Sequence, residues 1–123
     1  MAESNNFSHS AAILPVSDLS RSIEFYTQKL GFEKTFEWGQ PPYYAVVKRG
    51  GVGIHLTKRA DAIMPSKYHR ALYIFVKDVD DVYKQCKNEG VKIVNDIEDR
   101  DYKMKDFDIE DPEGFIITFG KGD

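Results

Sequence analysis

Apolar positions along the chain recur with two different periods, and each period predicts one kind of element. Between residues 17 and 31 they recur at helical spacing, at Leu19, Ile23, Tyr26 and Leu30. Ser17 or Asp18 suits the N-cap of this helix, and Gly31 stands where a helix-ending glycine belongs. We therefore expect one amphipathic helix in this segment.

Shorter stretches are apolar throughout or alternate between apolar and polar residues, which is typical of strands. In the first half of the chain they cover residues 11–16, 32–38, 43–48 and 52–57. In the second half they cover residues 71–76, 91–97, 104–110 and 115–119. Gly50-Gly51 predicts a hairpin between two of them, and the stretch from Asp111 to Gly114 has the composition of a tight turn.

The second half repeats the order of the first. A second helix is expected from its cap, Asp78, to Gly90, with an apolar face made of Val79, Val82, Tyr83 and Cys86. Landmarks of the two halves match in order and spacing: Val16 with Val76, Asp18 with Asp78, Gly31 with Gly90, and Leu56 with Phe119. The pattern predicts two βαβββ modules, at about residues 8–57 and 70–120, joined by a linker at 58–69.

A strand–helix–strand opening followed by antiparallel hairpins predicts a mixed sheet with its helix on one face, so the expected fold class is α+β. Each module then leaves the other face of its sheet uncovered. Pairing two such faces, within one chain or between chains, encloses a cleft in which a ligand can bind.

The composition of the chain restricts its expected cellular location and its expected binding partners. The single domain of 123 residues has a formal net charge of −3 and no block of basic residues, which argues against nucleic acid as a partner. Its one cysteine, Cys86, is expected to be a buried helix residue and suits a reducing cytoplasm. No apolar stretch is long enough to span a membrane, and residues 1–10 lack the apolar core of a signal peptide. We therefore expect a cytoplasmic protein with no membrane partner.

Three stretches of the chain carry a family resemblance. They are ILPVSDLSRSIEFYTQKLGF (13–32), ALYIFVKDVDDVYKQCKNEGV (71–91) and YKMKDFDIEDPEGFIITFG (102–120). Together they resemble the vicinal oxygen chelate superfamily, the group of glyoxalases, bleomycin-resistance proteins and extradiol dioxygenases. The resemblance implies the glyoxalase/bleomycin-resistance fold of paired βαβββ modules, in a homodimer that shares its clefts between chains.

Metalloenzymes of this superfamily hold a divalent ion on four side chains, one from the first and last strand of each module. The resemblance implies that the corresponding positions here are Ala11, His55, Ala71 and Thr118. Alanine has no donor atom and one imidazole is not a metal site, so we expect no metal ion, no other cofactor and no catalytic residue. A two-residue shift in register would instead bring His9, His55 and His69 together, because such a shift keeps each strand's face.

Strand alternation also predicts which side chains line the cleft. The ligand-binding residues expected from the strands and the aromatic lining are Ile13, Trp38, Tyr44, Tyr73, Tyr102 and Asp106, and the resemblance adds His55 and Thr118 from its metal-ligand positions. The aromatic rings suit a flat or cationic ligand, and the carboxylate of Asp106 favours a cation. The residues expected in the core instead are Phe36, Phe75 and Phe107. Asp108 and Glu110 are expected on a solvated face, with Arg100 and Lys105 as surface ion-pair partners of the acidic strand.

Three functions fit this sequence. The favoured one is metal-independent binding of a small ligand, such as a cationic aromatic antibiotic that is sequestered as by bleomycin-resistance proteins. The second is a lyase, isomerase or transferase of the same superfamily, such as a glyoxalase-like enzyme, using a metal or His55 as a base. The third is a module whose cleft is filled and which contacts a partner protein. Metal content after purification without chelators, and an open cleft near Ala11 and Ala71, discriminate among them.

Overall fold

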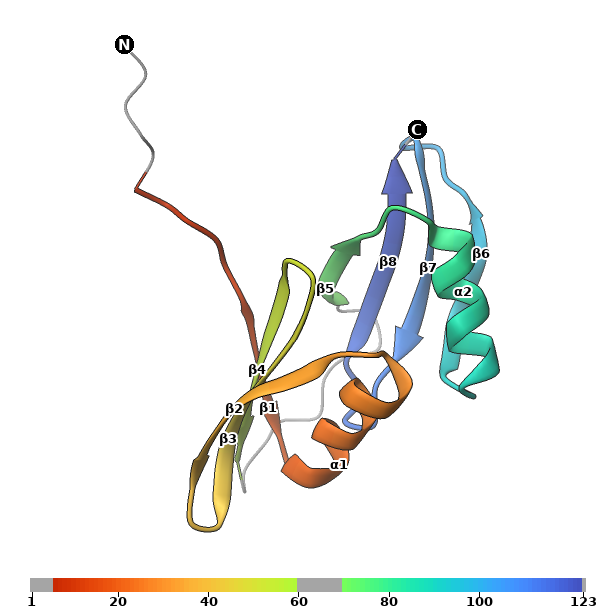
Figure 1. Ribbon diagram of the computed structural model, residues 1–123. Helices are drawn as coiled ribbons and strands as arrows, with labels where there is room; N and C mark the ends of the chain where they lie inside the picture. Colours follow the sequence, from red (N-terminus) through yellow and green to blue (C-terminus); the bar gives the residue numbers. More distant parts are fainter. Residues whose placement is uncertain (1–5, 60–69, 123) are drawn as a thin grey trace.

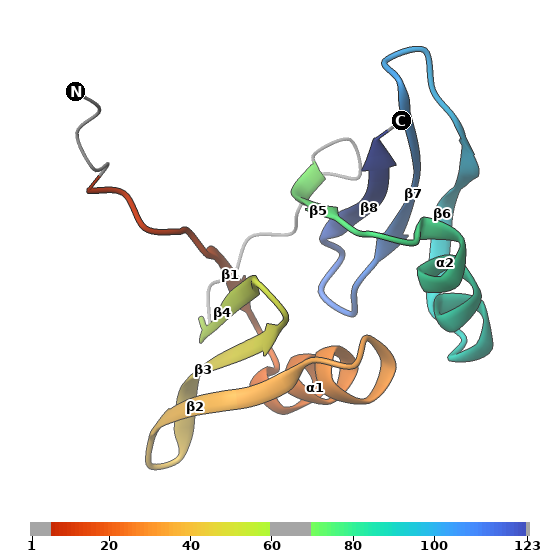
Figure 2. The ribbon, with the colours of Figure 1, turned by 45° about the horizontal axis from the view of Figure 1, so that its top comes forward.

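Two four-stranded mixed sheets form the protein, and a helical segment covers one face of each sheet (Figures 1 and 2). The computed structural model describes residues 6–59 and 70–122. In each sheet the first strand of the half pairs parallel to the last strand, and the other pairs are antiparallel. The predicted α+β class with two similar sheets is therefore confirmed.

The elements follow the predicted order in both halves. The first half contains β1 (Ala12–Val16), α1 (Leu19–Glu24), the π-helical segment η1 (Phe25–Lys29), β2 (Glu33–Gly39), β3 (Pro42–Arg49) and β4 (Val52–Lys58), in the sheet order β1-β4-β3-β2. The second half contains β5 (Arg70–Phe75), α2 (Val79–Asn88), β6 (Lys92–Asp99), β7 (Met104–Glu110) and β8 (Ile116–Gly122), in the sheet order β5-β8-β7-β6. Of the predicted linker, residues 60–69 lie outside the described residues.

Both helical segments begin and end as their sequences predict. The side chain of Asp18 accepts a hydrogen bond from the backbone of Arg21 at 3.0 Å, and that of Asp78 accepts one from Asp81 at 3.1 Å. The glycines that follow, Gly31 and Gly90, have φ angles of 72° and 71°, which glycine adopts without strain. The pattern did not predict that the first helix widens into a π-helical segment after Glu24.

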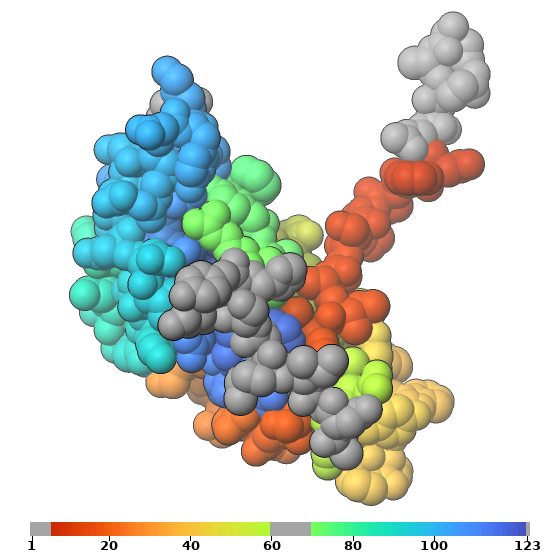
Figure 3. Space-filling model, turned by 180° about the vertical axis from the view of Figure 1, so that it is seen from behind, coloured from red at the N-terminus to blue at the C-terminus, as the bar shows by residue number. Residues whose placement is uncertain are grey.

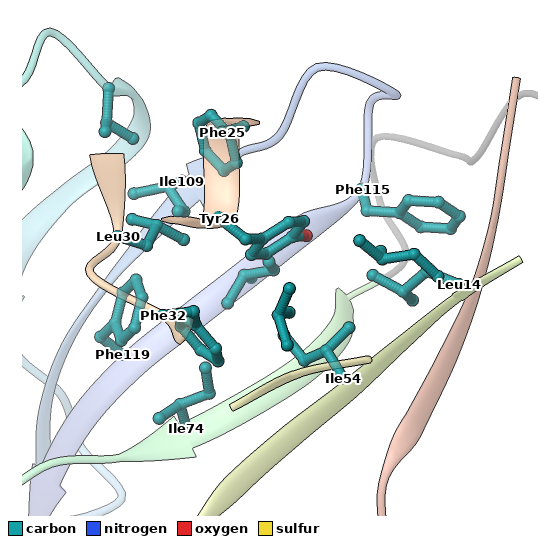
Figure 4. Close-up of a cluster of buried hydrophobic side chains, with 14 of the residues drawn as sticks. Leu14, Phe25, Tyr26, Leu30, Phe32, Ile54, Ile74, Ile109, Phe115 and Phe119 are labelled. Carbon is teal, nitrogen blue, oxygen red and sulfur yellow. The ribbon is translucent and has the colours of Figure 1, made fainter. Parts of the chain in front are cut away.

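One cluster of buried apolar side chains joins the two halves, and Tyr26 of η1 lies within it (Figure 4). Its ring makes edge contacts with Phe25 and Phe32, at centroid distances of 5.2 and 5.8 Å. Its hydroxyl donates to Oδ2 of Asp111, at 2.7 Å. Burial raises the pKa of this tyrosine, and the neighbouring carboxylate raises it further.

Asp111 begins the turn between β7 and β8, and its carboxylate organises that turn. Its Oδ1 accepts hydrogen bonds from the backbone N–H groups of Glu113 and Phe115, at 2.9 and 2.8 Å. Burial raises the pKa of Asp111, although these hydrogen bonds act in the opposite direction. The turn is therefore held by its own first residue and by Tyr26 from the other half.

The side chain of Glu113, in the same turn, joins the two halves a second time. Its carboxylate accepts hydrogen bonds from the backbone N–H groups of Ser17 and Asp18, at 2.9 and 3.2 Å, and from the hydroxyl of Ser17. It also forms an ion pair with Arg21 at 2.8 Å. Burial alone raises the pKa of Glu113, but these donors outweigh it and the pKa is lowered.

No helix in residues 6–59 and 70–122 is long and apolar enough to cross a membrane.

Candidate functional site

The face of the first sheet that points away from α1 carries two rows of side chains. The strand register sets the first row across all four strands as Ile13, His55, Val46 and Phe36. The register sets the second row as Pro15, Thr57, Tyr44 and Trp38. The alternating residues, among them Leu14 and Leu56, are buried in the core, so this open face is distinct from the helix-covered face.

Phe36 and Trp38 form an exposed aromatic pair at the edge of this face. Their rings are stacked, with an interplanar angle of 10° and centroids 6.4 Å apart. The exposed fractions are 49% for Phe36 and 59% for Trp38. The prediction that Phe36 belongs to the core is therefore wrong, because β2 is the edge strand and this face has no helix over it. Two parallel rings with accessible faces can stack against a flat ligand.

Tyr44 and His55 form a polar pair beside the aromatic rings. The hydroxyl of Tyr44 lies 2.6 Å from Nδ1 of His55, and the two rings meet edge to face. This hydrogen bond orients the imidazole. Within the described part of the chain, Nε2 of His55 has no hydrogen-bond partner, so it can bond to a ligand.

The corresponding face of the second sheet is built around Asp106. Its Oδ2 accepts hydrogen bonds from the hydroxyls of Tyr73 and Tyr102, at 2.9 and 2.7 Å, and its Oδ1 accepts one from Nε of Arg100 at 2.7 Å. Burial raises the pKa of Asp106, but the hydrogen bonds outweigh burial and the pKa is lowered. Burial, together with the same carboxylate, raises the pKa of both tyrosines, so the hydroxyls remain protonated donors.

Asp108 is held in the same way one row further along β7. Thr118 and Asn95 donate to its carboxylate, and Arg70 lies 3.4 Å from it as an ion-pair partner. Asp108 is 1% exposed, so the prediction that it lies on a solvated face is wrong. A carboxylate this deeply buried requires several donors, and three strands supply them.

The acidic alternation of β7 therefore gives this face little free negative charge. Asp106 forms an ion pair with Arg100. The sequence predicted an exposed surface pair, which is wrong because Asp106 has no exposed surface. Lys105 pairs with Asp80 instead. What the face presents to its surroundings is the ring of Tyr102, together with Phe75, which is 73% exposed. Phe75 was predicted to be core, which is wrong, whereas Phe107 is fully buried as predicted.

The four positions that the family resemblance equates with metal ligands carry side chains that do not suit a metal ion. Ala11 and Ala71 have no donor atoms, and the hydroxyl of Thr118 donates to Asp108. Only the imidazole of His55 remains, and its Nδ1 is bonded to Tyr44. In the described ranges no three His, Cys, Asp or Glu side chains are grouped so that they could hold a metal ion.

Of the three histidines that a two-residue register shift would bring together, the structure describes His9 and His55. His55 and His9 line one pocket of about 320 Å³ together with Ala11. His9 belongs to residues 6–11, which leave the first sheet as an extended arm (Figure 3). His69 lies outside the described residues.

The eight residues predicted to bind a ligand fall into two groups of four, one on each sheet. Ile13, Trp38, Tyr44 and His55 lie on the open face of the first sheet, and the other four lie on the second. Asp106 and Thr118 have no exposed surface, so Tyr73 and Tyr102 stand between Asp106 and any ligand. No hydrogen bond or ring contact joins the two groups within the described residues.

Several residues that build these faces were not predicted from the sequence. Asn95 and Arg70 reach Asp108 from β6 and β5, and no sequence spacing indicates either contact. The exposure of Phe36 was also missed. The signal for it was available, because Phe36 and Trp38 share a face of the strand that precedes a hairpin.

Two repeated βαβββ units with an open, partly aromatic sheet face define a class of small two-module α+β proteins. The chain belongs to the Glyoxalase/Bleomycin resistance protein/Dioxygenase superfamily, whose family model matches residues 7–119.

Three individual relatives share 28% or less of their aligned residues with this chain. A bleomycin resistance protein of Geobacillus stearothermophilus is 28% identical over 122 residues, which cover 86% of this chain and 90% of that protein. Among solved structures, the bleomycin-binding protein of bleomycin-producing Streptomyces verticillus, complexed with copper(II)-bleomycin, superposes with a TM-score of 0.75 at 21% identity, covering 97% of this chain and 99% of that one. TnmS3, an antibiotic binding protein from Streptomyces sp. CB03234, gives 0.76 at 22% identity, covering 97% and 99%. At such identities the structural matches support the fold.

Proposed function

We propose that this protein binds a small molecule with a flat aromatic group, of the kind found in bleomycin antibiotics, and sequesters it without a metal ion of its own. The stacked and exposed pair of Phe36 and Trp38, on a sheet face that no helix of residues 6–59 and 70–122 covers, carries this proposal. The names of the similar bleomycin-resistance and antibiotic-binding proteins support the ligand class.

The proposed ligand stacks on Phe36 and Trp38 and hydrogen-bonds to His55. The faces of the aromatic rings attract a cationic ligand. The carboxylates of Asp106 and Asp108 do not contribute to this attraction, because they are buried and already paired with arginines. Binding to such a site depends only weakly on salt, since no exposed carboxylate takes part. The proposed assembly is a homodimer, in which the open face of one sheet meets that of a second copy and the two groups of four residues line a shared cleft.

Titration with bleomycin, followed by the fluorescence of Trp38, tests the proposal, because Trp38 is the one tryptophan of the chain. We expect a saturable change, and calorimetry of the Trp38→Ala variant should show binding weakened about tenfold, which is about 1.4 kcal/mol. The matched control is Tyr43→Ala, which removes a ring that is 50% exposed on the opposite face of β3 and should leave affinity unchanged. No change in fluorescence and no heat of binding would contradict the proposal.

Metal analysis of protein purified without chelators separates this proposal from an enzymatic function. We expect less than stoichiometric nickel, zinc, manganese and iron, because the equivalent ligand positions include Ala11 and Ala71. Stoichiometric metal that is lost in a His55→Ala variant would favour a metal-dependent enzyme instead.

A further inference from the structure

The two halves repeat each other closely enough for their helix ends to be compared position by position. Adding 60 to a residue number gives the counterpart in the second half as far as Tyr26, and adding 59 does so from Gly31 onward. The hydrogen bond from Phe32 N–H to the carbonyl of Tyr26, 2.9 Å long, has its counterpart in that from Val91 N–H to the carbonyl of Cys86, 3.0 Å long. Tyr26 and Cys86 therefore occupy equivalent positions.

The side chains that fill the space beside Tyr26 are missing beside Cys86. At the first helix, the turn between β7 and β8 supplies the carboxylate of Glu113 to the N–H groups of Ser17 and Asp18. At the second helix, the equivalent turn between β3 and β4 is Gly50-Gly51, which has no side chain to supply. The large ring of Tyr26 is likewise replaced by the small side chain of Cys86.

A pocket of about 400 Å³ occupies this space, between the β3–β4 turn and the start of α2. Its floor is apolar and contains Val82, Phe119 and the buried thiol of Cys86. Burial raises the pKa of that thiol to about 11, although the charge of Arg49 acts against the rise, so the floor is uncharged at neutral pH. The volume is within the range of pockets that bind small molecules.

The charged groups around the pocket are unequal in sign and in pairing. Lys29, Arg49 and Lys77 face two acids, Asp78 and Asp81. Neither Arg49 nor Lys77 has an ion-pair partner among the described residues. The side chain of Asp78 is engaged as the N-cap of α2, where it accepts from the backbone of Asp81. The pocket is therefore cationic by one charge.

The backbone at the start of α2 adds hydrogen-bond donors to the positive charge of the pocket. In the first half, the N–H groups of Ser17 and Asp18 bond to the carboxylate of Glu113. Their counterparts, the N–H groups of Lys77 and Asp78, have no hydrogen-bond partner among residues 6–59 and 70–122. A carboxylate is the group that satisfies the equivalent donors within this same chain.

We propose that this pocket, which adjoins the open face of the second sheet at Phe75 but lies at the start of α2, binds a small molecule that carries a carboxylate on a flat apolar body. The carboxylate bonds to Lys77 and the two free N–H groups, in the position that Glu113 takes in the other half. The apolar body lies over Cys86 and Val82, where the ring of Tyr26 lies in the other half, and reaches the guanidinium of Arg49.

A nuclear magnetic resonance titration of the full-length, ¹⁵N-labelled protein with 2-naphthoate tests the proposal, with uncharged 2-naphthylmethanol as the comparison probe. We expect saturable shifts of the amide signals of Gly50, Gly51, Lys77 and Asp78, with the alcohol binding at least about tenfold more weakly. Shifts confined to Trp38 and His55 would assign the probe to the sheet face and overturn the proposal. Equal binding of the alcohol, or no saturable shift, would overturn it too.

Three variants, one just before α2 and two on it, check the charge assignment. Lys77→Ala should weaken binding of 2-naphthoate by up to about fivefold, and Asp81→Asn should tighten it by a similar factor. Lys84→Ala is the matched control, since this lysine lies on the same helix but does not line the pocket, and it should have no effect. Equal effects of Lys77→Ala and Lys84→Ala would contradict a specific contact.

Discussion

Asp106 shows how a charged residue can be predicted on the correct face while its burial and its hydrogen-bond donors go unpredicted. Alternation along β7 places it opposite Phe107, as expected. Alternation does not reveal that Tyr73, Tyr102 and Arg100 cover it, because these residues come from two other segments. Burial with three donors makes the carboxylate a structural anchor of the face.

Replacing this carboxylate should change how stability depends on pH. The pKa of Asp106 is lowered in the folded protein, so its contribution is present above the unfolded pKa of about 4 and is lost as the pH falls through the folded pKa. Asp106→Asn should lower the free energy of unfolding by about 1–3 kcal/mol at neutral pH and by less in acid. Urea denaturation at neutral pH and near pH 3 measures both values.

The control for this experiment is Glu98→Gln, which removes the exposed ion-pair partner of Arg100. Its effect at neutral pH should be below about 0.5 kcal/mol. An Asp106→Asn variant whose stability loss is the same at both pH values would contradict a role for the negative charge.

Tyr26→Phe tests the buried contact between the halves. It leaves the ring packing intact but removes the only side-chain donor to Asp111 in the described part of the chain, and this carboxylate is 3% exposed. The free energy of unfolding should fall by about 1–3 kcal/mol, measured by urea denaturation. Tyr43→Phe, at an exposed tyrosine, should change it by less than about 0.5 kcal/mol. Equal effects of the two variants would show that the hydroxyl of Tyr26 contributes nothing.

At the scale of elements, Gly120 of β8 leaves room for a ring to cross the strand. A Cβ atom at this position would lie 2.1 Å from the hydroxyl oxygen of Tyr73 and 2.7 Å from the ring carbon that carries it. Because Gly120 has no side chain, Tyr73 of β5 can cross β8 and reach Asp106 on β7.

Gly120→Ala should expel the ring of Tyr73 from this path and break its hydrogen bond to Asp106. We expect a loss of about 1–2 kcal/mol in the free energy of unfolding and a changed near-ultraviolet circular dichroism spectrum. Gly122→Ala, where the nearest atom is the sulfur of Met104 at 3.5 Å, is the control and should alter neither. An unchanged spectrum of Gly120→Ala would contradict the predicted movement.

Helices and strands were the most predictable part of the structure. Caps at Asp18 and Asp78 and glycines at 31 and 90 specify the helix ends locally, so one sequence suffices to place them. The π-helical segment η1 was not predictable. It contains the adjacent buried residues Phe25 and Tyr26, and no cap or spacing in the sequence marks its start.

For the whole molecule, the internal repeat allowed the fold to be predicted, but not the completed site. A repeat is a property of one chain, whereas the open faces need something opposite them before they enclose a ligand. Ile13 of the edge strand β1 is the clearest example, because an isoleucine that is 62% exposed on an open sheet face is expected to be covered by a partner.

We therefore expect a homodimer in solution, with the open face of the first sheet at the interface. Sedimentation velocity should show a dimer, and Ile13→Glu should shift it toward a monomer by placing a charge in that interface. Tyr43→Glu, which places a charge on the opposite side of β3, should leave the dimer intact. A monomeric parent protein, or a dimer unaffected by Ile13→Glu, would contradict this arrangement.

The hydrogen bonds from Tyr73 and Tyr102 to Asp106 also affect the thermodynamics of binding. Both rings are held in one orientation before any ligand arrives, so their rotational freedom has already been lost during folding. A ligand that contacts them avoids an entropic cost of about 0.5–1.5 kcal/mol for each side chain. The buried acid thus acts as a preorganising element, and it favours rigid ligands whose shape matches a surface that does not adapt.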